Sequence, residues 1–124
     1  MNTAEKELFN RVKAHLLEQG ERAHRASQLE GFDHYKCWYH LPSGLKCAVG
    51  CLITDELYHP DMEGSTIVDE PLYSGLIDSG IDMGGKAVSI LRKLQNVHDH
   101  VDPSEWSEAI DRVEVQLMRK RIAL

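Results

Sequence analysis

Residues 37–53 read CWYHLPSGLKCAVGCLI and contain all three cysteines of the chain. The first five residues are mostly aromatic or apolar, which predicts a short strand or hairpin near residues 37–41. A turn signal follows at 42–44, and apolar residues then recur at helical spacing from Leu45 onward. We therefore expect a helix over 45–53 that is apolar on nearly all sides and lies at the centre of the fold.

The segment before this stretch predicts a long first helix. Asn2 or Thr3 can cap it, Glu5 stands where a capping box has its acid, and Gly20 follows as a stop. Apolar residues between these signals recur every three or four positions. The first helix is expected to run to about residue 19.

The segment after the cysteine stretch predicts three more helices. A short one is expected at 70–77, a longer one along the apolar stripe of residues 87–98, and a last one after Asp102, with Pro103 at its first position. A chain of 124 residues fits one core. The sequence thus predicts a mainly α (α+β) fold: a single compact domain over residues 1–124, with about five helices and the short strand or hairpin near 37–41.

Charge is distributed unevenly along the chain. Fourteen Lys and Arg residues against 20 Asp and Glu residues give a net charge of −6, and no Lys or Arg occurs between Lys46 and Lys86. That interval contains eight acids: Asp55, Glu56, Asp61, Glu63, Asp69, Glu70, Asp78 and Asp82. Such a segment repels phosphate backbones, so we expect no nucleic-acid partner. It is either a solvated surface or a face for a cationic partner.

The amino terminus has acids where a signal peptide has basic residues followed by a long apolar run. No later stretch approaches the length of a membrane span, so no membrane partner is expected. An odd number of cysteines is typical of reduced thiols or metal ligands rather than of a disulfide framework. We expect a cytoplasmic protein, and the sequence leaves its oligomeric state open.

A cysteine nucleophile is one interpretation of the chain. In the first turn of the predicted helix, Cys47 would have its thiolate stabilised by the helix dipole and by the adjacent Lys46. His98 followed by Asp99 could supply a base and its orienting acid, with His40 as the alternative base. The opposing interpretation is a buried cysteine in an apolar site, which is inert.

A metal site is the second interpretation. Cys37, Cys47 and Cys51 with one of three histidines (His34, His40 or His59) would make a zinc set, although their spacing is poor for one. The cluster from His98 to Asp102 could also hold a divalent ion, but it is equally typical of a helix end and the next cap. We therefore expect neither a metal nor a cofactor.

Ligand or partner binding is the third interpretation. Tyr39, Lys46, Tyr58 and Glu63 are the residues expected to line a binding site, with aromatic walls and a few polar groups. Glu63 could accept hydrogen bonds from a base edge or an amine. Each aromatic could instead belong to the core. Binding needs no special spacing of residues, so we favour it over catalysis.

Several motifs resemble one family. Cys37-x-Tyr39, the run from Gly44 to Ile53, the pair Glu63-Gly64 and the pair His98-Asp99 together look like a family of small bacteriophage and prophage proteins. The resemblance covers residues 37–64 closely and 91–124 loosely.

This resemblance implies a phage-type accessory protein in the host cytoplasm. Such a protein would bind a host protein or a small, nucleotide-like ligand and inhibit a host process or defence. The alternatives that the residues themselves leave open are a hydrolase with Cys47 as nucleophile and a small metal-binding domain.

Overall fold

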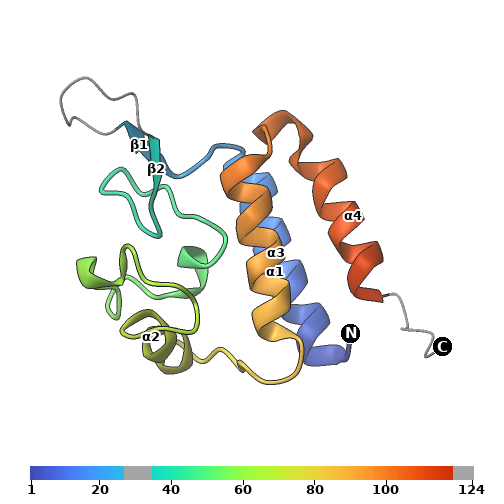
Figure 1. Ribbon diagram of the computed structural model, residues 1–124, viewed down its shortest axis with the longest axis horizontal. Helices are drawn as coiled ribbons and strands as arrows, with labels where there is room; N and C mark the ends of the chain where they lie inside the picture. The colour runs from blue at the N-terminus through green and yellow to red at the C-terminus, as the bar shows by residue number, and fades with distance from the viewer. Residues whose placement is uncertain (27–34, 119–124) are drawn as a thin grey trace.

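The structure is a computed structural model that describes residues 1–26 and 35–118 (Figure 1). Its α-helices are α1 (Thr3–Gln19), α2 (Leu72–Asp78), α3 (Ala87–His100) and α4 (Trp106–Met118). Strands β1 (His24–Ala26) and β2 (Tyr35–Cys37) form an antiparallel pair, and three 3-10 turns are η1 (Gly50–Leu52), η2 (Pro60–Met62) and η3 (Pro103–Glu105). The fold is mainly α, as the sequence predicts.

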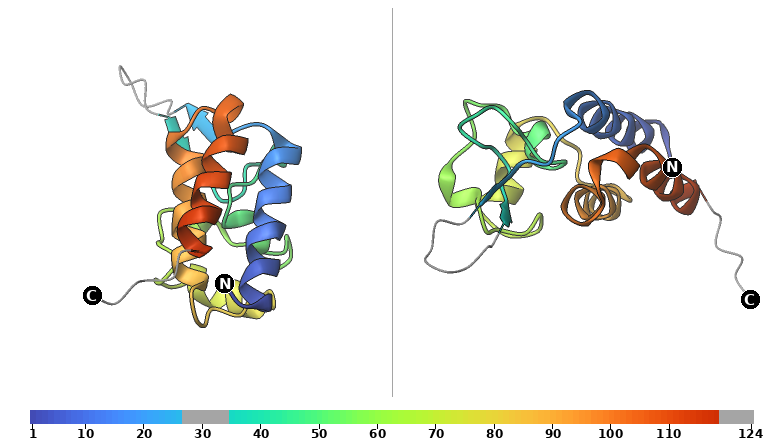
Figure 2. Two further views of the ribbon diagram at one scale, coloured as in Figure 1. Left: turned by 90° about the vertical axis from the view of Figure 1, so that its right-hand side faces the viewer. Right: turned by 90° about the horizontal axis from the view of Figure 1, so that it is seen from above.

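Two parts lie side by side in the molecule. Helices α1, α3 and α4 pack against one another as a bundle (Figure 2). Residues 38–85, which we call the loop lobe, contain α2, η1 and η2 and lie on the side of the bundle away from α4 (Figures 1 and 2). None of the described helices combines the length and the apolar character needed to cross a membrane.

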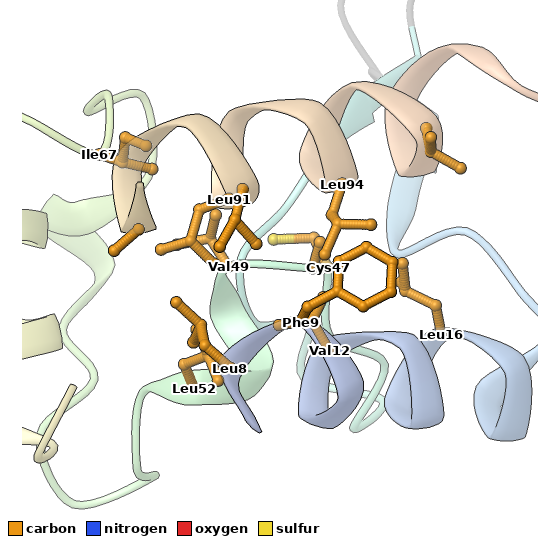
Figure 3. Close-up of a cluster of buried hydrophobic side chains, with 14 of the residues drawn as sticks. Leu8, Phe9, Val12, Leu16, Cys47, Val49, Leu52, Ile67, Leu91 and Leu94 are labelled. Atoms are coloured by element: carbon orange, nitrogen blue, oxygen red, sulfur yellow. The ribbon is translucent and has the colours of Figure 1, made fainter. Parts of the chain in front are cut away.

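The core joins the loop lobe to the bundle. Figure 3 shows side chains of α1 facing those of α3, with side chains of the loop lobe between them. The fully buried members are Phe9, Val12 and Leu16 of α1, Leu91 and Leu94 of α3, and Cys47, Val49 and Leu52 of the loop lobe. Burying one aliphatic side chain of this size contributes roughly 1.5–3 kcal/mol. The loop lobe is therefore part of the single core rather than a covering on it.

The ends of α1 confirm the predicted signals. The Asn2 side chain accepts the Glu5 N–H at 2.8 Å, and the Glu5 carboxylate accepts the Asn2 N–H at 2.8 Å, so the capping box is complete. At the other end Gly20 has φ +64°, and its N–H donates to the Leu16 carbonyl. Glycine adopts this left-handed conformation without a steric cost, which explains why the helix stops there.

The predicted helix over 45–53 is wrong. The Cys51 N–H donates to the Cys47 carbonyl at 3.1 Å, and the chain then tightens into the single turn η1. At Gly50 the backbone lies so close to residue 39 that an added Cβ would stand 2.0 Å from the Tyr39 carbonyl oxygen. The apolar spacing predicts a helix here, but the chain instead packs closely against the backbone of residue 39.

The predicted strand over 37–41 is misplaced. β2 ends at Cys37, whose register partner is His24, and in the described residues after it only His40 forms an isolated bridge, with Lys46. The described part of the chain has four α-helices where about five were predicted, because 45–53 is not one of them. The expected helices near 70–77 and 87–98 correspond to α2 and α3.

Candidate functional site

Cys47 is buried rather than placed at a helix amino terminus. Its side chain is 0% exposed, and its Sγ accepts the Gly50 N–H at 3.3 Å. Desolvation by burial raises the pKa of the Cys47 thiol well above its usual value. Burial likewise raises the pKa of Cys51 to about 12, and the Cys51 thiol donates to the Ala48 carbonyl. Both thiols are therefore protonated at neutral pH, contrary to the activated thiolate that the sequence suggested.

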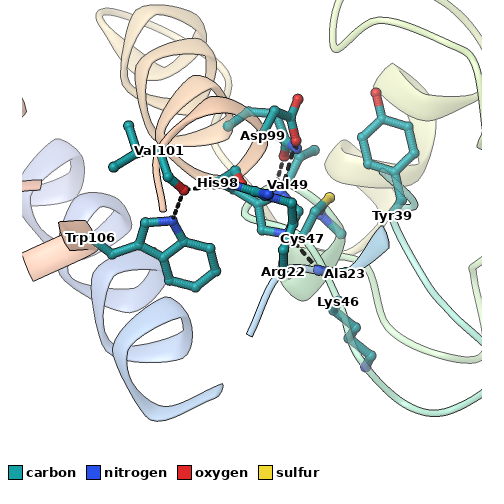
Figure 4. Close-up of polar contacts among 12 residues, drawn as sticks. Arg22, Ala23, Tyr39, Lys46, Cys47, Val49, His98, Asp99, Val101 and Trp106 are labelled. Atoms are coloured by element: carbon teal, nitrogen blue, oxygen red, sulfur yellow. Dashed lines mark hydrogen bonds and ion pairs between the residues drawn. The ribbon is translucent and has the colours of Figure 1, made fainter. Parts of the chain in front are cut away.

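His98 and Asp99, the predicted base and acid, do contact each other beside Cys47 (Figure 4). His98 is 0% exposed, and its Nε2 accepts the Ala23 N–H at 2.8 Å. The proton of the neutral ring is therefore on Nδ1, which donates to Asp99 Oδ1 at 2.8 Å. Both ring nitrogens are occupied, so His98 cannot take the Cys47 proton without losing its bond to Ala23.

The surroundings of His98 explain why the histidine is held inside. The Arg22 side chain donates to the carbonyls of His98 and Val101, and the Trp106 indole N–H donates to the same Val101 carbonyl at 2.9 Å (Figure 4). The Trp106 ring lies 5.6 Å from the His98 ring, centroid to centroid. His98 thus ties the end of α3 to the chain before β1 and has a structural role.

His40, the alternative base, is also occupied. Its Nε2 lies 2.7 Å from the Gly50 carbonyl oxygen, which only accepts, so Nε2 carries the proton. Its Nδ1 lies 3.6 Å from Asp55 Oδ1, and the Lys46 ammonium pairs with the same oxygen at 2.9 Å. Desolvation by burial lowers the pKa of His40, with the nearby Lys46 charge adding to the effect. The ring is neutral and turned toward the backbone.

Among the predicted metal ligands that the structure describes, none are gathered into a site. Within residues 1–26 and 35–118, no group of three or more His, Cys, Asp or Glu side chains is placed to hold a metal ion. Asp102 instead accepts the Ser104 N–H as a cap, and His59 Nδ1 accepts the Asp61 N–H. His34 and the Cys37 side chain lie outside the described residues.

The structure does bring together Tyr39, Tyr58 and Glu63. The Glu63 carboxylate accepts the Tyr39 N–H at 2.9 Å, the His40 N–H at 3.2 Å and the Tyr58 hydroxyl at 2.6 Å. Burial and the neighbouring Glu63 carboxylate raise the pKa of the Tyr58 phenol. Lys46 is linked to this cluster through Asp55 and His40. These residues bind one another, so the cluster forms a clamp within the loop lobe.

Tyr39 also lines an open cavity that Tyr58 and Glu63 do not line. Its volume is about 320 Å³, and it is lined by Arg92, Gln95, Asn96 and Asp99 of α3 and by Tyr39, Ser65, Thr66 and Ile67 of the loop lobe. The cavity combines a cation, a carboxylate, two amides, an aromatic ring and an apolar side chain. Such a mixture of apolar walls and a few polar groups is typical of small-molecule sites.

Sequence reasoning found Tyr39 and Asp99 but missed Arg92, Gln95 and Asn96. The signal was present, because positions 92, 95, 96 and 99 share one face of a helix. A polar face on a helix is ordinarily a solvated one, so only the packing of the loop lobe against α3 shows that this face is half enclosed.

Other hollows offer less. One of about 360 Å³ on α4 is lined by only four residues, among them the exposed Val115. Another of about 240 Å³ lies between α1 and the glycine turn at residue 80. We call the cavity lined by Tyr39 and Asp99 the α3 cavity. Neither of the two other hollows adjoins a buried polar network as the α3 cavity does.

Comparisons of the chain with protein-family models, with curated proteins and with solved structures gave no match.

Proposed function

We propose that the protein is a small phage-type accessory protein that binds a small polar ligand in the α3 cavity and thereby inhibits a host process. The observation that carries the binding proposal is that a cation, Arg92, and a carboxylate, Asp99, both line one wall of this cavity, which Tyr39 lines as well. The phage-type role rests on the sequence resemblance of residues 37–64.

Arg92 gives the strongest support. It is exposed, and in the part of the chain that the structure describes its guanidinium has no hydrogen-bond or ion-pair partner. A guanidinium presents five N–H donors in a planar fork suited to carboxylate or phosphate groups. A cation without an internal partner at the edge of a cavity is a natural contact for an anionic ligand.

The cysteine chemistry favours binding over hydrolysis. Cys47 has a raised pKa, and the unprotonated Nε2 of His98 already accepts the Ala23 N–H. The unprotonated Nδ1 of His40 lies 3.6 Å from Asp55 Oδ1. A nucleophile requires a thiolate and a base within hydrogen-bond reach. The described geometry supplies neither, so the hydrolase alternative has the weaker support.

The test is a binding screen of the full-length protein by thermal shift and isothermal titration, using a panel of small anions, amino acids and nucleotides. Arg92→Gln should weaken binding of the active compound, because the charge-assisted contact is lost. The matched control is Lys93→Gln, which removes the same charge from the next residue of α3, outside the cavity lining. The proposal fails if no compound binds, or if both variants bind like the wild type.

The acidic loop lobe supports a second candidate, docking of a basic host protein. Residues 47–85 carry eight carboxylates and no Lys or Arg. Asp61, Asp69 and Asp78 are exposed. Such a surface attracts a cationic partner and repels nucleic acid.

The test of this candidate is a pulldown at low and high salt. It compares the wild type with the triple variant Asp61→Asn, Asp69→Asn, Asp78→Asn. Docking through the lobe predicts one partner whose capture falls with salt and is lost in the triple variant. Equal capture by the two proteins would exclude it.

A further inference from the structure

We infer that the ligand of the α3 cavity is a small organic carboxylate that carries no ammonium group, with its carboxylate held by Arg92 and Asn96. This inference rests on the proposed function, that the cavity binds a small ligand, and it adds the class of ligand. Three features of the cavity carry it: the donors that have no internal partner, the acceptors that are already bonded and the balance of charge on the lining.

Two side chains of α3 offer donors to the cavity. Arg92 and Asn96 both line it, and they are four residues apart, so they are neighbours on one face of the helix. Both are exposed, and within residues 1–26 and 35–118 neither side chain takes part in a hydrogen bond or ion pair. The planar fork of a guanidinium can donate two parallel bonds to a carboxylate, and a neighbouring amide can donate a third.

The backbone of Ile67 adds one more donor. Figure 3 shows Ile67 beside the first turns of α3, near Leu91. Ile67 lines the cavity and is 5% exposed, and among the described residues its N–H donates no hydrogen bond. An N–H without a partner in a nearly buried residue is rare and calls for an acceptor. A ligand rich in acceptors meets this need.

The acceptors on the same lining are already engaged. Asp99 Oδ1 accepts the Gln95 amide at 2.8 Å and the His98 Nδ1–H at 2.8 Å (Figure 4). A further interaction also engages Asp99, whose side chain is only 28% exposed. Gln95 Oε1 in turn accepts the Val49 N–H at 3.0 Å. An ammonium group on the ligand would have to compete with these donors for the carboxylate, and it would also lose its own hydration.

The charges of the lining favour a single negative charge on the ligand. Among the described lining residues Arg92 is the only cation, and Asp99 is an acid on the same wall. Asp69 adds another acid beside the cavity, because the hydroxyl of the lining residue Thr66 donates to its carboxylate at 2.9 Å. A carboxylate matches the one guanidinium. A phosphate monoester carries a charge of about −1.5 to −2 at pH 7, and these acids would repel the excess.

The rest of the lining suits an apolar body of limited size. The Tyr39 hydroxyl donates to the Ser65 carbonyl, which fixes the aromatic ring. The ring of Tyr39 and the side chain of Ile67 give an apolar group a surface to pack on. The volume of about 320 Å³ is at the lower end of the range for ligand sites. An aryl or short alkyl carboxylate therefore fits better than a larger molecule.

The experiment is isothermal titration of the full-length protein with matched compounds. One set is 3-phenylpropionate, its amide, phenylalanine and phenyl phosphate, and the other is hexanoate, its amide and norleucine. Each amino acid differs from the carboxylate of its set by a single ammonium group. We expect a carboxylate to bind tightest in its set. Its amide should bind about tenfold or more weakly, the usual loss for one charge-assisted contact, and the amino acid should also bind more weakly.

Arg92→Gln should remove the difference in affinity between the carboxylate and its amide, because the charge that distinguishes them has lost its partner. Lys93→Gln removes the same charge outside the cavity lining and should leave that difference unchanged.

Three results would overturn the ligand class and leave the proposed function standing. The amide, the amino acid or phenyl phosphate binds as tightly as the carboxylate; Arg92→Gln weakens carboxylate and amide alike; or only compounds that are not carboxylates bind, with an affinity that depends on Arg92. If no small compound binds, or if Arg92→Gln and Lys93→Gln both bind like the wild type, both proposals fall.

Discussion

The Glu63 carboxylate accepts a hydrogen bond from the Tyr58 hydroxyl, with 2.6 Å between the two oxygens, and it also accepts the backbone N–H groups of residues 39 and 40. The Tyr58 ring stacks on the His40 ring with centroids 4.2 Å apart and planes 8° from parallel. One carboxylate therefore holds two distant turns of the loop lobe together. Of the four residues predicted to bind a ligand, only Tyr39 lines the α3 cavity.

Glu63→Gln should destabilise the protein. A glutamine amide has one accepting oxygen, so at least one of the three donors is left without its partner, and the bonds that remain lose their charge. Leaving a half-buried donor unpaired costs about 1–3 kcal/mol. Urea unfolding followed by circular dichroism measures the change. Glu56→Gln, an exposed position in the same lobe, is the control and should stay within about 0.5 kcal/mol of the wild type.

Gly50→Ala should be far more costly than Gly75→Ala. The added Cβ at position 50 would meet the Tyr39 backbone at 2.0 Å, and backbone held in place by the Glu63 clamp cannot move aside easily. At position 75 the nearest atom is the flexible end of Met62, at 2.6 Å. We expect a loss of about 3 kcal/mol or more at position 50, the range of severe overpacking. Equal losses in urea unfolding would contradict the described path of the chain at η1.

Cys47 should react slowly with iodoacetamide at neutral pH. Its raised pKa leaves almost no thiolate, and its side chain is fully buried. Peptide mapping by mass spectrometry after a short exposure distinguishes Cys47 from the other two cysteines. We expect modification of Cys47 only after unfolding in urea. Rapid native labelling at this residue would revive the nucleophile interpretation.

His40 should make stability depend on pH. Burial lowers the pKa of His40 in the folded protein below the ordinary value of about 6.5, so the unfolded chain binds a proton more readily. The contribution of neutral His40 is complete above pH 6.5 and is lost as the pH falls below it toward the folded-state pKa. Unfolding free energies measured at intervals from about pH 7 to about pH 5 should decrease accordingly.

The control for His40 is His40→Gln, whose amide can replace the donor to the Gly50 carbonyl but does not titrate. Its stability should vary less over the same interval, because other groups titrate alike in both proteins. Parallel pH profiles for the two proteins would show that His40 is not responsible.

Local signals predicted α1 well. Its capping box at Asn2 and Glu5 and its stop at Gly20 involve residues within four positions of one another, so their effect does not depend on the rest of the fold. The apolar stripe of α3 also predicted its helix correctly, because a helix buries residues at a fixed spacing. The same pattern did not predict that the polar face at Arg92 and Asn96 lines a cavity, because the cavity depends on another segment packing against that face.

The sequence by itself determined a mainly α chain, the ends of α1 and the residues that would be buried, including the apolar run from Cys47 to Ile53. Only the tertiary structure decided that this run makes one turn and not a helix, because the Tyr39 backbone occupies the space beside Gly50. It also decided that His98 bonds to Ala23, 75 positions away, rather than to a cysteine. Backbone propensity and periodicity are properties of neighbours in sequence. The partner of a buried polar atom and the wall of a cavity depend on which distant segments meet, and no local pattern records that.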